Sequence, residues 1–110
     1  MDLPAHFSAF LHHCHSGRNL SENTIKAYGQ DLAELKRYLA EPRRESPTTP
    51  AGLVSYSQWL SDCRRLAPAT VKRRLACLRA LLGWAERRGL IVTSPFRTVP
   101  FHGIGTPLRG

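Results

Sequence analysis

The residues best suited to chemistry in this chain are cations that gather in one short segment. Eight Lys and Arg residues lie between residues 64 and 88, where Glu86 is the only acid. The whole chain has 110 residues, with 16 Lys and Arg against 8 Asp and Glu, which gives a net charge of +8. Positive charge concentrated in this way is typical of a surface that binds a nucleic-acid backbone. The alternative is the solvated helix face of a protein that is merely basic.

A long helix must position these cations. We expect it to begin at Pro68 and to end near Arg88, with Gly89 as a left-handed C-cap. Apolar residues recur at spacings of three and four, as on one buried stripe, at Val71, Leu75, Leu78, Leu82 and Ala85. The opposite side is small and cationic, with Arg73, Ala76, Ala80 and Arg87 flanked by Lys72 and Arg79. Such a side allows close approach to a polyanion.

Three further helices are predicted, and no strands, so the fold class is all-α. The first runs from about Leu3 to His15, and the second follows the N-cap Ser21 and extends to Leu39. The third follows the N-cap Thr49 and extends to about Cys63. Proline-rich residues 41–50 form a loop, and residues 96–110 lack a helical period, which is typical of an extended linker.

The second helix adds polar side chains on its exposed side. Its apolar stripe comprises Ile25, Tyr28, Leu32, Leu35 and Leu39, and Asn23, Lys26 and Gln30 lie on the reverse side. A glutamine amide such as that of Gln30 can bind adenine through two hydrogen bonds in a major groove. Thr24 either caps the helix or donates to a phosphate.

Several kinds of chemistry are not expected. The spacing of Cys14, Cys63 and Cys77 favours neither a disulfide framework nor a thiolate metal site, and it fits a reducing cytoplasm. The histidines at 12, 13 and 15 project about 100° apart per residue on a helix, so they cannot converge on one ion. We expect no metal, no cofactor and no membrane partner, since nothing resembles a signal peptide or a membrane span. The chain is therefore predicted to be soluble and cytoplasmic.

Two segments together carry a family resemblance. Residues 20–35 read LSENTIKAYGQDLAEL, with Leu-Ser before a Thr, a Tyr four residues on and then Asp-Leu. Residues 70–95 add Thr70 and Val71, Leu78-Arg79, Trp84, Arg-Arg-Gly-Leu at 87–90 and a closing Ser-Pro. The chain resembles the N-terminal core-binding domain of tyrosine recombinases, the phage-integrase and Xer family. It departs from the pattern at Ala76, where the family often has Ser, and at Ser94, where it usually has Asn.

The resemblance implies a four-helix SAM-like bundle that clamps one face of a recombination half-site. Residues 1–95 would be the core-binding DNA-binding domain, and residues 96–110 the start of a linker to an absent catalytic domain. The implied partners are a double-stranded DNA recombination site and other recombinase protomers, and the gene would be bacterial, phage or mobile-element encoded. The parent protein would break and rejoin DNA, whereas this chain would have no catalytic residue. The alternative is a SAM-like helical interaction or oligomerisation domain that does not bind DNA.

The expected DNA contacts lie on the second and fourth helices. They are Asn23, Thr24, Lys26, Gln30, Thr70, Lys72, Arg73, Arg74 and Arg79. Lys72 and Arg73 match contact positions of the family. Arg74 lies nearer the core edge and could instead extend over apolar neighbours, and Arg79 could instead pair with Asp31 across two helices. His15 and Arg18 match the spacing of the family's catalytic His-x-x-Arg box, but at the end of a helix we interpret this as chance.

Overall fold

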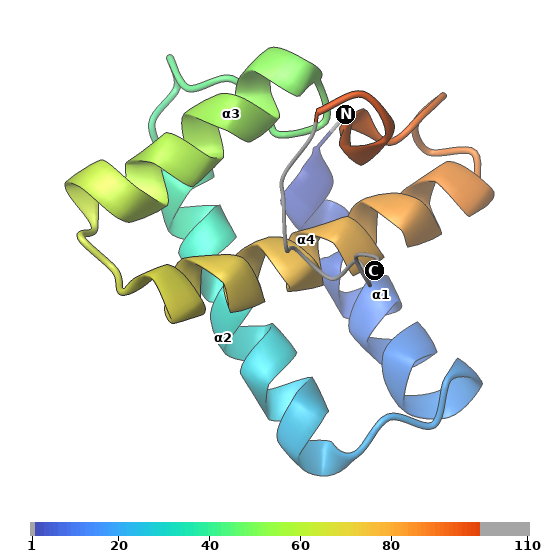
Figure 1. Cartoon of the computed structure of the whole chain (residues 1–110). Coiled ribbons are helices and arrows are strands. Elements are labelled where there is room, and N and C mark those ends of the chain that lie inside the picture. Colours follow the sequence, from blue (N-terminus) through green and yellow to red (C-terminus); the bar gives the residue numbers. More distant parts are fainter. Residues whose placement is uncertain (1, 100–110) are drawn as a thin grey trace.

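The chain is described over residues 2–99 by a computed structural model, in which every regular element is helical. The α-helices are α1 (Phe7–His12), α2 (Glu22–Leu39), α3 (Pro50–Gln58) and α4 (Pro68–Arg87). No strand occurs between residues 2 and 99, so the all-α prediction is confirmed. In Figure 1, α1 and α2 are joined at one end and α4 crosses both, with α3 beside the far end of α2.

The predicted helix caps are present. The Ser21 hydroxyl oxygen accepts a hydrogen bond from the backbone N–H of Thr24 (3.2 Å), and that of Thr49 accepts one from Gly52 (3.1 Å). Gly89, with φ +75°, ends α4 in a Schellman motif: Leu90 N–H donates to the Ala85 carbonyl, and Gly89 N–H donates to that of Glu86. The helix boundaries therefore follow from local chemistry that the sequence displays.

Two of the helical segments are less regular than the sequence predicted. The first is a continuous run of a 3₁₀ turn at Leu3–His6, then α1, then a π turn at His13–Gly17. A second π turn, Trp59–Cys63, extends α3. Each π turn is followed by a residue with positive φ, Asn19 after the first and Arg65 after the second. The predicted extents are thus nearly right, but the helix type is not uniform.

The core draws side chains from all four helices. Leu53, Leu60 and Leu78 are buried, Leu78 as its stripe predicted, and Phe10 contacts Trp84 with ring centroids 5.6 Å apart. The buried side of α4 is wider than the predicted stripe, because Cys77, Leu81 and Trp84 are buried too. The reason is that α4 packs against several elements at once, α2 and the turn after α3 among them.

The segment after α4 folds back onto the bundle. Ser94 and Pro95 are buried, and Pro95–Arg97 forms a 3₁₀ turn in which the Phe96 N–H donates to the Ser94 hydroxyl oxygen. Phe96 and Val99 pack against the core. The first four residues of the predicted linker therefore contact the domain, and its remainder, residues 100–110, lies outside the described residues.

Candidate nucleic-acid interface

An open hollow of about 890 Å³ lies along the exposed side of α4. Ala76, Ala80 and Gly83 are small residues at helical spacing, as the sequence predicted for the two alanines. Around them stand the arginines Arg18, Arg79, Arg87 and Arg97, together with the aromatic side chains of Tyr28 and Phe96. The hollow thus joins residues from the segment before α2, from α2 and α4 themselves, and from the segment after α4.

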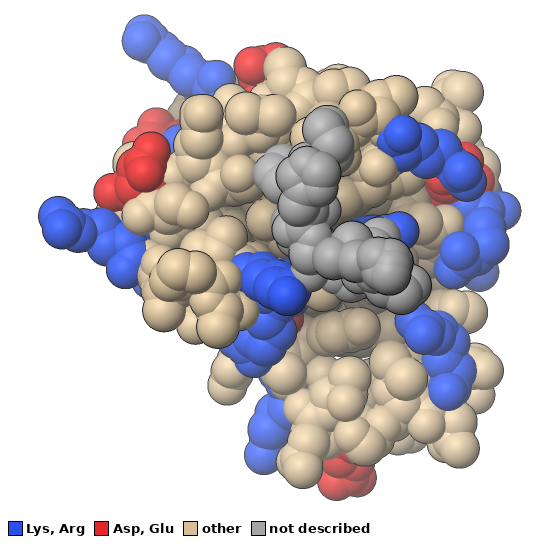
Figure 2. Space-filling model, viewed as in Figure 1, with Lys and Arg blue, Asp and Glu red and all other residues tan. Residues whose placement is uncertain are grey.

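The charge around this hollow is positive. Glu86 is the one acid among the described lining residues, and its carboxylate accepts hydrogen bonds from Arg97 Nε and from the Ser94 N–H. The hydrogen bond from Arg97 is the main cause that lowers the pKa of Glu86, and the charge of Arg87 lowers it as well. Figure 2 shows Lys and Arg gathered around this face of the molecule, with most acidic side chains toward its edges.

The predicted contact residues of α2 and of the first turns of α4 lie at or near the surface. Asn23, Lys26, Gln30 and Lys72 are exposed. Thr24 is half-buried, and its hydroxyl oxygen accepts a hydrogen bond from the hydroxyl of Ser21, the residue that caps the helix. Thr70 is also half-buried and lies in the first turn of α4. Since α2 packs against α4, these residues belong to two elements in direct contact.

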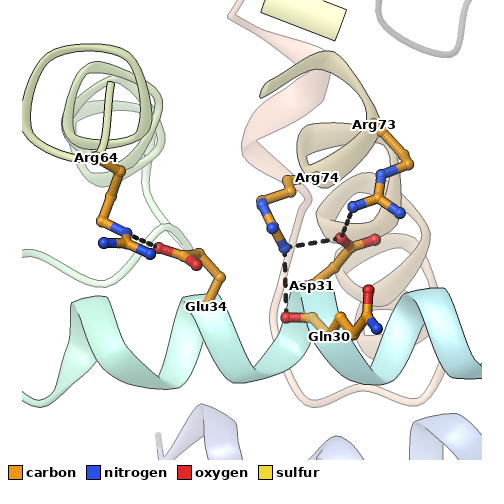
Figure 3. Close-up of polar contacts among 6 residues, drawn as sticks. All are labelled: Gln30, Asp31, Glu34, Arg64, Arg73 and Arg74. Atoms are coloured by element: carbon orange, nitrogen blue, oxygen red, sulfur yellow. Dashed lines mark hydrogen bonds and ion pairs between the residues drawn. The ribbon is translucent and has the colours of Figure 1, made fainter. Parts of the chain in front are cut away.

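The arginines at the start of α4 converge on a buried carboxylate of α2 (Figure 3). Arg74 Nη1 donates to Asp31 Oδ1 at 3.0 Å and to the Gln30 carbonyl at 3.4 Å, and Arg73 Nη2 lies 3.3 Å from the same Oδ1. Burial raises the pKa of Asp31, and the two guanidinium groups oppose this rise. The sequence suggested Arg79 as a partner of Asp31; the ion pairs that the structure gives this carboxylate are with Arg73 and Arg74.

A second buried acid of α2 lies one turn further on. Glu34 pairs with Arg64, which follows the π turn after α3 (Figure 3). Asp31 and Glu34 therefore tie α2 to α4 and to the α3 segment, and their carboxylates pair with three of the clustered cations, Arg64, Arg73 and Arg74. Sequence reasoning missed this use of Glu34 and Arg64, although both acids directly precede inward leucines, Leu32 and Leu35.

The expected DNA contacts did not include Arg18, Arg87 or Arg97, which all line the hollow. Arg18 and Arg97 come from segments outside α4, so only the fold places them at the same hollow. Arg87 could have been predicted from the sequence, since it lies on the small, cationic side of the predicted helix. The hollow is thus more extensive than the predicted site.

Most phenols and thiols between residues 2 and 99 are withdrawn from solvent, whereas the Cys63 thiol is exposed. Tyr38 and Tyr56 are buried and Tyr28 is half-buried, and burial is the main cause that raises the pKa of each phenol. Burial likewise raises the pKa values of the Cys14 and Cys77 thiols. Between residues 2 and 99, no three His, Cys, Asp or Glu side chains are grouped as metal ligands would be. In the same range, no helix has the length and apolarity needed to cross a membrane.

Comparison with known proteins identifies the family. Residues 7–89 match the model of the phage integrase N-terminal SAM-like domain. A tyrosine recombinase of Agathobacter rectalis is 27% identical over 104 residues, which cover 92% of this chain and 32% of the relative. Tyrosine recombinase XerC of Bifidobacterium longum is 30% identical over 101 residues, which cover 91% of this chain and 28% of the relative. Tyrosine recombinase XerD of Vibrio cholerae is 32% identical over 79 residues, which cover 71% of this chain and 26% of the relative.

The match therefore takes in most of this chain, which spans about a third or less of the length of these curated relatives. No solved structure matches the chain. The family match covers all four α-helices, and the helical architecture agrees with the bundle that the resemblance implied. The chain belongs to the phage integrase N-terminal SAM-like domain family.

Proposed function

We propose that this chain is the DNA-binding module of a site-specific tyrosine recombinase, and that α2 and α4 contact duplex DNA. The observation that carries the proposal is the hollow along α4, whose small side chains are surrounded by arginines. Small side chains allow close approach of a nucleic-acid backbone, and guanidinium groups bind its phosphates through paired N–H donors.

The dimensions of α4 suit a duplex. Lys72 and Arg87 are 15 residues apart, which corresponds to about 22 Å along the helix axis at about 1.5 Å per residue. The major groove is about 12 Å wide, so the two cations can reach phosphates of both strands while the small side chains between them face the groove. On α2, Asn23, Lys26 and Gln30 are exposed, and we propose that they add contacts.

The activity of a whole recombinase belongs to this proposal as well. The relatives named tyrosine recombinases are about three times as long as this chain. We infer that strand cleavage and joining require the part of such a protein that this chain does not match, and that the natural partners are a recombination site and further protomers. The source is a bacterium, a phage or a mobile element, and the protein acts in the cytoplasm.

Fluorescence anisotropy with a labelled duplex at two salt concentrations tests the proposal. We expect micromolar or weaker affinity, near the non-specific range of about 10⁻⁴ to 10⁻⁶ M. If about four phosphates are contacted, raising the salt from about 50 to about 200 mM should weaken binding roughly a hundredfold. Binding that is absent at low salt, or that does not respond to salt, would refute it and would favour an apolar protein-interaction domain.

Matched substitutions locate the contact surface. Replacing Lys72 or Arg87 with Ala should lower the dependence of log affinity on log salt by about one unit each. Arg43→Ala removes the same charge from the loop between α2 and α3, beside a different hollow, and should leave binding unchanged. Equal effects of all three substitutions would place the DNA elsewhere.

A further inference from the structure

The crossing of α2 and α4 holds two guanidinium groups on one buried carboxylate. Both contact Asp31 Oδ1, whereas Asp31 Oδ2 and Arg74 Nε are buried without a hydrogen-bond partner. One negative charge thus faces two positive charges, so the group as a whole carries a net charge of +1. A carboxylate placed only to join two helices would need a single arginine.

The two arginines are unequal. The Arg74 side chain is 14% exposed and also donates to the Gln30 carbonyl, so its guanidinium belongs to the helix crossing. The Arg73 side chain is 46% exposed and lies next to the exposed Lys72. Its guanidinium is a planar fork with five N–H donors, and Asp31 contacts it through Nη2.

We propose that Asp31 is a positioning residue that holds the Arg73 guanidinium in place for a DNA phosphate, an inference that rests on the proposed function. An unrestrained arginine loses side-chain entropy when it is fixed on a ligand. Arg73 is already restrained by Asp31 in the free protein. Arg74 neutralises the carboxylate, which limits its repulsion of an approaching phosphate.

We expect the substitution Asp31→Asn to change DNA affinity in the direction opposite to that expected from charge alone. Removing an acid beside a DNA-binding surface ordinarily strengthens binding, because the surface becomes more positive. If Asp31 positions Arg73, then Asp31→Asn should weaken binding even though the net charge rises by one. The repulsion that Asp31 itself exerts on a phosphate is small, since Arg73 and Arg74 lie 3.3 and 3.0 Å from its Oδ1 and offset its charge.

Fluorescence anisotropy at low salt shows whether Asp31→Asn binds DNA more weakly or more tightly than the wild type. We expect Asp31→Asn to lower the affinity about threefold to tenfold, where tenfold corresponds to about 1.4 kcal/mol. Glu34→Gln is the matched control, since it removes the same charge from a buried acid of the same helix whose partner is Arg64. That variant should bind as tightly as the wild type or more tightly.

A double-mutant cycle separates positioning from a general structural effect. In an Arg73→Ala background, Asp31→Asn should no longer weaken binding, because the side chain that it positions is gone. If Asp31→Asn lowers the affinity equally in both backgrounds, the effect does not act through Arg73 and the proposal is overturned.

Arg73→Lys tests the positioning role independently, in case Asp31→Asn unfolds near the assay temperature. Arg73→Lys leaves Asp31 paired with Arg74 and keeps the charge, but it replaces the fork with a single ammonium group. We expect affinity about threefold lower than wild type. Wild-type affinity in Arg73→Lys, or tighter binding by a folded Asp31→Asn, would overturn the positioning role. Loss of salt-dependent binding by the wild type itself would instead refute the proposed function.

Discussion

Arg74→Met tests the buried ion pair that joins α2 and α4. Methionine keeps much of the length of arginine but leaves Asp31, whose side chain is 2% exposed, with Arg73 as its remaining partner. Breaking a buried pair by removing one partner typically costs about 3 to 5 kcal/mol. Two features lower that figure here: Arg73 stays 3.3 Å from the carboxylate, and the change removes Nε, a buried donor without a partner.

The expected loss in the free energy of unfolding is therefore about 2 kcal/mol, below the usual range for a broken buried pair. For a domain of this size, that corresponds to a fall in Tm of roughly 8 to 16 °C. Urea and thermal unfolding followed by circular dichroism measure both quantities. Lys72→Met is the matched control, because it removes an exposed cation from the same helix and should change the stability by less than about 0.5 kcal/mol.

The pH dependence of this loss has a definite sign. Burial raises the pKa of Asp31 above its ordinary value of 3.8, and removing Arg74 raises it further, since Arg74 acts to lower it. Because the pKa of this carboxyl group is higher in the folded than in the unfolded state, its contribution to the free energy of unfolding is fully present at low pH. That contribution falls as the pH rises through the folded-state pKa. The deficit of Arg74→Met should thus be small near about pH 3 and widen toward neutral pH. A deficit below about 0.5 kcal/mol, or one that is independent of pH, would refute this reasoning.

Four further predictions concern the core, two glycines and the chemistry. Leu78→Ala should cost about 2 to 5 kcal/mol in urea unfolding while the folded fraction keeps its DNA affinity; a loss below about 1 kcal/mol would contradict the assignment of the buried side of α4. In thermal melts, Gly52→Ala should destabilise by about 1 to 3 kcal/mol, because its Cβ would lie 1.8 Å from the Ser46 carbonyl oxygen. Gly29→Ala, whose Cβ meets nothing within 4 Å, should instead stabilise α2 by about 0.5 to 1 kcal/mol. Incubation with a nicked duplex should yield no covalent adduct, since burial raises the pKa of all three tyrosines; an adduct lost on a Tyr→Phe change would show a self-contained enzyme.

The helices were predictable because their signals are local. Ser21 and Thr49 lie directly before apolar stripes of helical period, and Gly89 follows the last residues of one. Each cap involves residues close together in the chain, so the sequence alone displays it. The π turns at the ends of two helices carry no comparable signal.

The arrangement of charges was less predictable because it depends on how distant elements pack. Arg73, Arg74 and Lys72 are neighbouring cations in the sequence, yet only the crossing of α2 and α4 determines which of them contacts Asp31. The residues around the hollow were hard to predict for the same reason, since Arg18 reaches it from the segment before α2. Sequence patterns predicted which side of α4 is cationic, and tertiary packing decides how its cations are used.

The central claim is that the face formed by α2 and α4 binds duplex DNA, and amide chemical-shift mapping during a DNA titration tests it most directly. We expect shifts to concentrate at residues 18–30, 70–87 and 94–97, and to fade when salt is added. Residues 41–63, which include α3, should be unaffected. Shifts centred on α3, or spread evenly over the chain, would contradict the account.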